Sequence, residues 1–397
     1  MADNISDVRM LKFPALIALL LLCVGCAGVT PRFVGPGSMR HVFVIVLENQ
    51  DFHRTFGPAT PAPYLGHVLP SQGVLLTQYF ATGHKSLDNY ITMISGQPPA
   101  PATQMDCKTF VDFQQTASPD AEGILPGNGC VYPASVQTVA DQLEARGLSW
   151  RGYMEEMGAD PSREAASCAH PATGGPGIVP AIPADNYAYR HNPFVYFHSI
   201  IDRQSDCDAH DVNLEKLKGD LASVRTTPNF SFIVPSLCSD GHDNPCADKR
   251  VGGLAAIDPF LKLWVPRILH SPAFKKDGLL VITFDESGSD MTACCNEPSG
   301  PNTSQPGLSG PGGGRIGALA ISIPATSPTH SVLYVKGIVA ATATGAKPVA
   351  LAILADGSPL SPEFMDVVRK NNVVLSRSSD RTLRAMGKVI GYGNRNS

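Results

Sequence analysis

Two apolar runs in the sequence end in side chains that can hold a metal ion. HVFVIVL is followed by Glu48 and Asn49, and LLVITF is followed by Asp285 and Glu286. Carboxylate and amide oxygens are the ligands that hard divalent cations prefer. Acids gathered at one place repel each other unless a cation neutralises them. We therefore expect these four residues to hold a divalent metal ion, whose identity they leave open.

A third apolar run, FIVPSLC, is followed by Asp240, His242 and Asp243. In open α/β sheets, ligands bind beyond the carboxyl ends of the strands. Parallel strands would bring the three sets of polar side chains to one edge. The alternative is that each acid only caps the loop or helix that follows it, but three such strands together favour the metal. A second ion would need Asp240 or Asp243.

The stretch GHKSLDNYITMISGQ places Ser86 just before an apolar-periodic segment, 87–94. One interpretation is an N-cap serine. The other is a nucleophile, because a helix N-terminus favours a phosphate group and a nearby metal ion helps a hydroxyl lose its proton. His84 and Asn89 flank the serine and are candidates to orient it or to bind a phosphate oxygen.

Two further histidines are candidates for work on a phosphate. His191, in RHNPFVYF, could donate to a phosphate oxygen or protonate a leaving group, although a hydrogen-bonded loop histidine explains it equally well. His242 is our first choice for stabilising charge or protonating the leaving group.

The elements that position these residues follow from the apolar pattern. Continuous apolar runs predict buried parallel strands at 42–47, 231–235, 279–284 and 316–323, with a weaker one at 148–153. Helical patterns lie between them. Strands that alternate with helices predict an α/β fold with helices on both faces of the sheet.

Two helices have predicted N-terminal residues. The segment 135–147 has Ser135 as a candidate N-cap. In DPFLKLWVPRIL, Asp258 is the candidate N-cap and Pro259 the first helical residue, and Pro266 is expected to kink the helix.

The N-terminal stretch MLKFPALIALLLLCVGCAG predicts export. Its apolar core is too short to span a bilayer comfortably and is typical of a signal peptide over residues 1–26, followed by a linker over 27–40. CVGC resembles a bacterial lipobox, so Cys26 is a candidate for lipidation, and simple secretion is the alternative. We expect membrane contact only through such an anchor.

The chain has ten cysteines, and eight remain once Cys23 and Cys26 are set aside. An even number in an exported chain predicts disulfides. The pairing cannot be read from the sequence, although Cys238 with Cys246 is sterically feasible. The adjacent pair at 294–295 lacks the CxxC spacing of a zinc site. The formal net charge of −4 lacks the basic footprint of a nucleic-acid binder.

Taken in order, six motifs resemble the bacterial phosphoesterase family of acid phosphatases and phospholipases C. They are VFVIVLENQDFHRTFG, GHKSLDNYITMISGQ, SWRGYMEEM, HNPFVYF, SLCSDGHD and VITFDESGSD. The resemblance covers residues 40–324 and defines a phosphoesterase domain over 41–324. It implies an alkaline-phosphatase-like fold, a three-layer α/β/α sandwich with a mostly parallel sheet.

The resemblance also implies site roles and a phosphoserine mechanism. Ser86 matches the nucleophile of the H-x-S-x-x-N-Y motif and His242 the histidine of DGHD. The four metal ligands match the residues expected above. In the family, GGGRIGALAIS is followed by a Tyr-x-His-Tyr-Ser-Leu-Leu helix, which this chain lacks. We therefore interpret 325–397 as a divergent or frameshifted segment, in which His330 is a candidate substitute for the missing histidine.

The predicted function is that of an exported, metal-dependent phosphomonoesterase acting on a small-molecule or lipid phosphoester. The first alternative is a phosphodiesterase of the phospholipase C type. The second is an exported binding lipoprotein whose site has lost its activity.

Overall fold

The computed structural model describes residues 39–294, 300–322, 350–352, 362–370 and 374–376. Its centre is a seven-stranded sheet with the strand order β2-β9-β8-β1-β7-β5-β6. The strands are β1 His41–Leu47, β2 Val74–Leu76, β5 Trp150–Met154, β6 Asp211–Asn213, β7 Phe230–Val234, β8 Gly278–Phe284 and β9 Ala318–Ser322.

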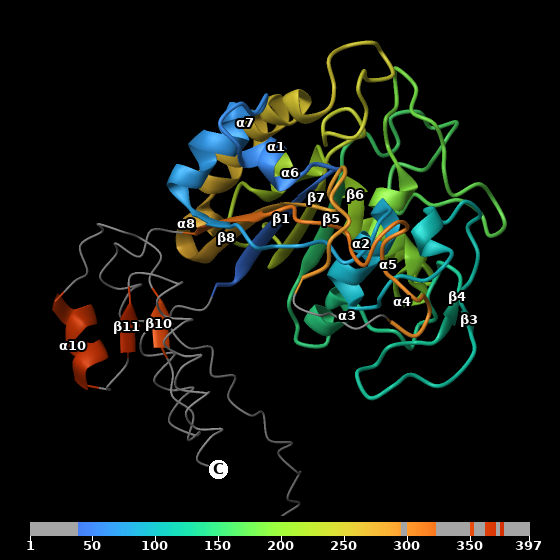
Figure 1. Ribbon diagram of the computed structural model, residues 1–397, viewed down its shortest axis with the longest axis horizontal. Coiled ribbons are helices and arrows are strands. Elements are labelled where there is room, and N and C mark those ends of the chain that lie inside the picture. The colour runs from blue at the N-terminus through green and yellow to red at the C-terminus, as the bar shows by residue number, and fades with distance from the viewer. Residues whose placement is uncertain (1–38, 295–299, 323–349, 353–361, 371–373, 377–397) are drawn as a thin grey trace, which may run out of the picture. The chain divides into compact units, whose positions relative to one another are not determined.

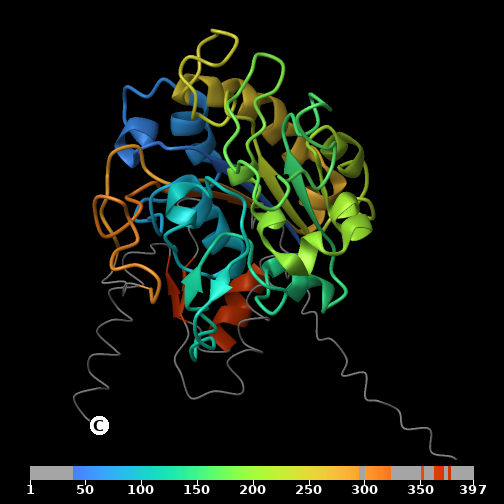
Figure 2. The same ribbon diagram turned by 90° about the vertical axis from the view of Figure 1, so that its right-hand side faces the viewer.

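Two layers of helices cover the sheet (Figures 1 and 2). One layer contains α6 Lys216–Asp220, α7 Leu254–His270 and α8 Pro272–Asp277, and the other contains α2 Ser86–Ser95, α3 Val139–Glu144, α4 His198–Ile201 and α5 Gln204–His210. The side chains of β1 alternate between the layers, because Phe43 and Ile45 pack with α7 whereas Val46 packs with α2. The predicted three-layer α/β/α architecture is therefore confirmed.

Short elements complete the described chain. They are α1 Phe52–Phe56, the helical turns Tyr64–Val68, Leu69–Gln72, Thr103–Met105, Tyr189–His191 and Pro193–Tyr196, the pair β3 Gln114–Gln115 with β4 Gly127–Asn128, the pair β10 Ala350–Ala352 with β11 Val374–Ser376, and α10 Pro362–Lys370.

The predicted direction of the strand at 316–323 is wrong. β9 runs antiparallel to β8, and β2 runs antiparallel to β9. The connection from β8 to β9 begins and ends at the same end of the sheet. There, the Ser287 N–H donates to the Gly313 carbonyl at 2.9 Å. A strand entered from that end must run back against β8. An apolar run carries no information about direction.

Both predicted N-caps are wrong. Thr138, not Ser135, caps α3, because Thr138 and Asp141 exchange hydrogen bonds in a capping box. Asp258 lies inside α7, which begins at Leu254 and includes both prolines. The Asp258 carboxylate instead accepts the N–H groups of Tyr64 at 2.8 Å and Leu65 at 3.1 Å, so it caps the turn Tyr64–Val68 of a distant segment.

The prediction of disulfides is confirmed. Three pairs are formed within the described residues, Cys107–Cys130, Cys168–Cys207 and Cys238–Cys246, and Cys294 is also disulfide-bonded. The signal peptide at 1–26, nearly all of the linker, and His330 lie outside the described residues. In the part of the chain that is described, no helix combines the length and apolar character needed to cross a membrane.

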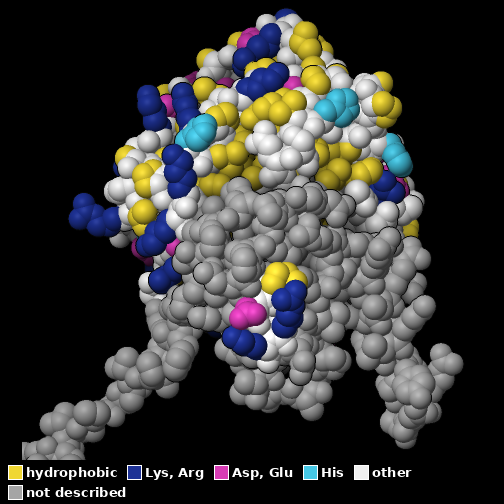
Figure 3. Space-filling view, turned by 90° about the vertical axis from the view of Figure 1, so that its left-hand side faces the viewer, with side chains coloured by type: hydrophobic (Ala, Val, Ile, Leu, Met, Phe, Trp, Pro, Cys, Tyr) yellow, Lys and Arg dark blue, Asp and Glu magenta, His cyan; other side chains and the backbone are white. Residues whose placement is uncertain are grey.

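The surface view in Figure 3 shows one face of the molecule. Lys and Arg side chains lie along one side of its described part, and apolar side chains lie across the middle. The expectation that the protein does not bind nucleic acid stays a prediction.

Candidate active site

The three sets of polar residues meet at one edge of the sheet, as expected. β8, β1 and β7 are neighbours, and Leu47 pairs with Phe284 at the ends of β1 and β8. Beyond these ends, the Asp285 N–H donates to the Leu47 carbonyl at 2.9 Å, and the Glu48 N–H donates to the Asp240 carbonyl at 2.9 Å. The loops after β5 (green) and β7 (yellow) extend from one end of the sheet in both ribbon views (Figures 1 and 2).

Glu48 lies at the centre of the site and is fully buried. Its Oε2 accepts the Ser86 hydroxyl at 2.9 Å, and its Oε1 accepts the Tyr90 hydroxyl at 2.7 Å. Both hydroxyls come from one face of α2, since they are four residues apart. Burial first, and then the charges of Asp285 and Asp240, raise the pKa of Glu48 well above its usual range.

Ser86 is the first residue of α2 and does not cap it. The capping position belongs to Lys85, whose φ of 139° is rare for a residue with a side chain, and whose own side chain does not cap the helix. The N-cap interpretation of Ser86 is therefore wrong. Its hydroxyl points to Glu48 instead, and the Asp106 carboxylate, from a later segment, accepts the Leu87 N–H of the first turn at 3.1 Å.

Asn89 holds the loop that precedes Ser86. Its Oδ1 accepts the N–H groups of Thr82 and Gly83, both at 3.0 Å, and its Nδ2 donates to the carbonyls of Gly83 at 2.8 Å and Lys85 at 3.0 Å. The two amide hydrogens and both acceptor positions are thus occupied. In this arrangement Asn89 positions the loop that carries Ser86 and has no free group for a substrate.

His84 and Glu286 form a buried pair beside the nucleophile. His84 Nδ1 lies 2.6 Å from Glu286 Oε2, and His84 Nε2 donates to the Asp290 carbonyl at 3.1 Å. Burial opposes a charge on His84, but the hydrogen bond and the charge of Glu286 outweigh it and raise the pKa of His84. The same Glu286 oxygen accepts the Lys85 N–H at 3.3 Å. This pair connects the loop of Ser86 to the end of β8.

His191 lies between two acids without forming a hydrogen bond to either. Its Nε2 is 3.4 Å from Glu48 Oε2, and its Nδ1 is 3.3 Å from Asp240 Oδ2. Its ring stacks on Tyr90 with 5.4 Å between centroids. Burial first, and then the charges of Arg190 and His242, lower the pKa of His191 well below its usual range. Both effects favour the neutral form of the imidazole.

Several polar atoms of the site are buried and have no hydrogen-bond partner, which is rare in folded proteins. Imidazole nitrogen and carboxylate or amide oxygens together suit a divalent cation, which could take one ring nitrogen of His191 and oxygens of the acids as ligands. The residues present therefore fit a metal ion. The unpartnered atoms are Asn49 Oδ1, Asp240 Oδ2, Asp285 Oδ2, and Nδ1 and Nε2 of His191.

The structure adds His191 and Asp240 to the candidate ligands. One ligand atom from each of Glu48, His191 and Asp240 lies within 4.8 Å of the others, and all three residues are buried. Glu286, a predicted ligand, has one oxygen engaged by His84. The sequence signal for Asp240 was its position after a third strand. His191 had no comparable signal, because loops and not a strand position it.

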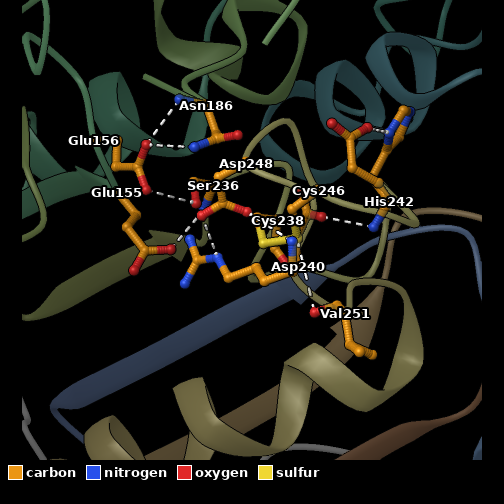
Figure 4. The surroundings of a disulfide bond; sticks show 12 residues. Glu155, Glu156, Asn186, Ser236, Cys238, Asp240, His242, Cys246, Asp248 and Val251 are labelled. Atoms are coloured by element: carbon orange, nitrogen blue, oxygen red, sulfur yellow. Dashed lines mark hydrogen bonds and ion pairs between the residues drawn. A yellow bond between two sulfur atoms is a disulfide. The ribbon is translucent and has the colours of Figure 1, made fainter. Parts of the chain in front are cut away.

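His242 lies on the loop closed by the Cys238–Cys246 disulfide, and Figure 4 shows it with Asp240. Its Nδ1 contacts Asp243 Oδ1 at 2.7 Å, and its Nε2 contacts Arg190 Nη2 at 3.2 Å. Because a guanidinium can only donate, Nε2 must accept. In this arrangement Nε2 of His242 accepts from Arg190, and the expected role of His242 in stabilising charge or protonating the leaving group stays a prediction.

The chain belongs to the phosphoesterase family, whose sequence pattern matches residues 65–331. It is 24% identical to a probable acid phosphatase of Kluyveromyces lactis over 253 residues, which are 63% of this chain and 48% of that protein. It is 29% identical to a phosphate-repressible acid phosphatase of Penicillium chrysogenum over 247 residues, 61% of this chain and 47% of that one.

The chain spans about half the length of the curated relatives it matches. These relatives are fungal, so the bacterial origin implied by the resemblance is not confirmed. Among solved structures, an alkaline phosphatase superfamily protein of Vibrio parahaemolyticus matches with a TM-score of 0.39 and 14% identity. That match covers 73% of this chain and 62% of the other.

Proposed function

We propose that the protein is an exported, metal-dependent phosphomonoesterase of the acid-phosphatase type that acts through a phosphoserine. The observation that carries the proposal is the contact of Ser86, the first residue of α2, with Glu48: the Ser86 hydroxyl donates to the Glu48 carboxylate. Around this pair lie buried atoms of metal-ligand type that have no hydrogen-bond partner. The printed names of the fungal relatives, which are acid phosphatases, support the same class of reaction.

Glu48, Asn49, Asp240, Asp285 and His191 would hold the metal ion, with Glu286 at its margin. When bound, a divalent ion would stabilise the negative charge that develops on the phosphoryl oxygens.

The residues of the chain perform the remaining work. Ser86 Oγ attacks phosphorus in line, and its proton moves to the oxygen it already contacts, Glu48 Oε2. The bond from phosphorus to the leaving oxygen breaks as the new bond to Oγ forms, and the leaving oxygen takes a proton from a solvent water. The hydroxide that remains attacks the phosphoseryl group and releases inorganic phosphate, while Glu48 returns its proton to Oγ and restores the hydroxyl. The dipole of α2, which begins at Ser86, stabilises the phosphoryl oxygens throughout.

Export is proposed from the cysteines. Disulfides persist in oxidising compartments, and the described residues contain three of them. Lipidation at Cys26 and simple secretion are the two alternatives within this proposal. The substrate class is a small-molecule or lipid phosphomonoester.

Substitution of Ser86 tests the proposal. Ser86→Ala should reduce turnover of p-nitrophenyl phosphate by roughly 10³-fold or more, because no other hydroxyl contacts Glu48 Oε2 in the structure. Chelation should abolish wild-type turnover, and added divalent metal should restore it. Ser95→Ala, at the far end of the same helix, is the matched control and should keep wild-type activity.

Three results would contradict parts of the proposal. Full activity in Ser86→Ala would exclude the nucleophile, and full activity after exhaustive metal removal would exclude the metal. Preference for p-nitrophenylphosphorylcholine over p-nitrophenyl phosphate would favour the diesterase alternative. No turnover of either ester at any pH would favour the binding-protein alternative.

A further inference from the structure

Arg190 is a buried cation that lacks an anionic partner. It lies on the turn Tyr189–His191, and only 7% of its surface is exposed. Its one side-chain contact is the 3.2 Å approach of Nη2 to His242 Nε2. Among the residues that the structure describes, no carboxylate forms an ion pair with it. Burying a charge without a partner is costly, so the position calls for an anion.

The guanidinium of Arg190 still has donor groups to offer. Its Nε and Nη1 form no hydrogen bond within the described chain. Neither nitrogen is among the fully buried polar atoms that lack a hydrogen-bond partner. A guanidinium presents its N–H groups as a rigid planar fork that matches two oxygens of a phosphate. His242 takes only one N–H of Nη2, so the other N–H of Nη2, together with Nε or Nη1, forms an edge suited to two oxygens of one ligand.

His242 fixes the orientation of the guanidinium. The Asp243 carboxylate engages Nδ1 of His242 at 2.7 Å, which leaves the lone pair of Nε2 for Arg190. The Asp240 carboxylate accepts the backbone N–H of His242 at 2.8 Å. The disulfide between Cys238 and Cys246 closes the loop that carries all three residues (Figure 4). The chain from Asp243 through His242 thus holds one edge of the fork and leaves the other edge free.

The charge of Arg190 lies near the carboxylates of the site. The next residue, His191, approaches Glu48 Oε2 to 3.4 Å, and this is the oxygen that accepts the Ser86 hydroxyl. The charge of Arg190 is also near enough to lower the pKa of both Glu48 and Asp240 against the larger opposing effect of their burial. A ligand that reaches Ser86 therefore meets this cation.

We propose that Arg190 binds the phosphoryl group of the substrate and selects phosphomonoesters over phosphodiesters. A monoester has three non-bridging oxygens and carries two negative charges when fully ionised. Two oxygens can meet the guanidinium while the third faces Ser86 and α2. A diester has only two non-bridging oxygens and one charge, so it must give up one of these contacts. This inference rests on the proposed function and assigns its substrate class to one residue.

Binding of inorganic phosphate tests the proposal without turnover. Calorimetric titration of the metal-loaded protein should show that Arg190→Met weakens phosphate binding roughly ten-fold or more, because a charge-assisted, two-point contact is lost. Arg190→Lys keeps the charge but not the fork, and should fall between Arg190→Met and wild type. Arg225→Met removes an exposed arginine elsewhere and is the matched control, with unchanged affinity.

A second measurement reports selectivity. The ratio of kcat/KM for p-nitrophenyl phosphate to that for bis(p-nitrophenyl) phosphate should fall in Arg190→Met and stay constant in Arg225→Met. A purely structural role of Arg190 would lower both rates together and leave the ratio unchanged.

The outcomes separate this inference from the proposed function. Wild-type phosphate affinity in folded Arg190→Met would overturn the inference alone. If Arg190→Met does not unfold cooperatively, the test rests on Arg190→Lys. Wild-type phosphate affinity together with a wild-type ratio of kcat/KM values in Arg190→Lys would overturn the inference. A wild-type protein that binds no phosphate would overturn the proposed function itself.

Discussion

The Glu48 carboxylate has two oxygens, and each receives a hydroxyl from the same helix. Ser86 occupies one, where the proposed chemistry takes place, and Tyr90 occupies the other at 2.7 Å. Tyr90 also stacks on His191, so one side chain orients two candidate metal ligands. We infer that Tyr90 is a positioning residue, because it contacts the ligands and does not contact the reacting hydroxyl.

Tyr90→Phe should lower kcat about ten-fold and leave KM nearly unchanged. The ring and its stacking on His191 remain, and only the hydrogen bond to Glu48 Oε1 is lost. Because this bond is buried and its acceptor is ionisable, unfolding free energy should also fall by roughly 1–3 kcal/mol. Steady-state kinetics at saturating metal and urea denaturation provide the two measurements.

Tyr132→Phe is the matched control for this experiment. Tyr132 is also fully buried, but its hydroxyl has no hydrogen-bond partner in the structure. Its removal should leave activity unchanged and stability equal or slightly higher. Equal kinetics in the two variants would contradict a positioning role for Tyr90.

At the scale of single residues, the sequence supports only part of the site. Glu48 and Asp285 follow directly from strands, so the sheet fixes their positions and their meeting could be predicted. The contacts of Arg190 and His191 depend on how the loops between β5 and β7 fold. No periodicity constrains such loops, so their roles could not be predicted. The assignment of the metal ligands stays a prediction.

At the scale of elements, the apolar runs located the central strands closely. β1, β7 and β8 begin or end within one residue of the predicted bounds. The direction of β9 and the two N-caps could not be read from the sequence. The direction of a strand depends on the end of the sheet at which the preceding loop enters it. A helix cap depends on which backbone N–H groups the folded chain brings near a carboxylate. Asp258 illustrates this, because it precedes a proline in sequence yet caps a turn nearly two hundred residues away.

Removal of the Asp258 carboxylate should release the turn Tyr64–Val68. Asp258→Ala leaves the N–H groups of Tyr64 and Leu65 without their acceptor, and we expect a loss of roughly 1–3 kcal/mol in the free energy of unfolding. Turnover by the folded variant should be unchanged, because no site residue lies on this turn. Chemical denaturation measures the first effect.

Asp258 also contacts Lys262 at 3.3 Å on the same helix. The lysine is more than half exposed, so this ion pair should contribute about 0.5 kcal/mol or less. Lys262→Ala removes only the ion pair and is the matched control. Equal destabilisation by the two substitutions would show that the ion pair, and not the cap, is the source of the effect.

At the scale of the whole molecule, one buried acid away from the site should shape the pH dependence of stability. Burial raises the pKa of Asp211 to about 7, against an ordinary value of 3.8. The folded protein therefore keeps a proton that the unfolded chain releases. This contribution to stability is complete below about pH 4 and is lost as the pH rises through 7.

Asp211→Asn should remove this dependence. Relative to wild type, the variant should gain roughly 2–4 kcal/mol in unfolding free energy between pH 4 and pH 8, as measured by urea denaturation at several pH values. Glu122→Gln, an exposed carboxyl on a loop, is the control and should not change the curve. Parallel curves for Asp211→Asn and wild type would show that Asp211 is ionised in the folded protein at pH 4.

The disulfide between Cys238 and Cys246 has a practical consequence. It joins two cysteines eight positions apart in the sequence, and the loop between them carries Asp240, His242 and Asp243. Protein produced in a reducing cytosol would have two thiols here and a loop without its covalent closure. The specific activity of such a preparation would report how completely the thiols have been oxidised. Expression in an oxidising compartment, or a thiol count on every batch, is therefore needed before kinetic constants can be compared between laboratories.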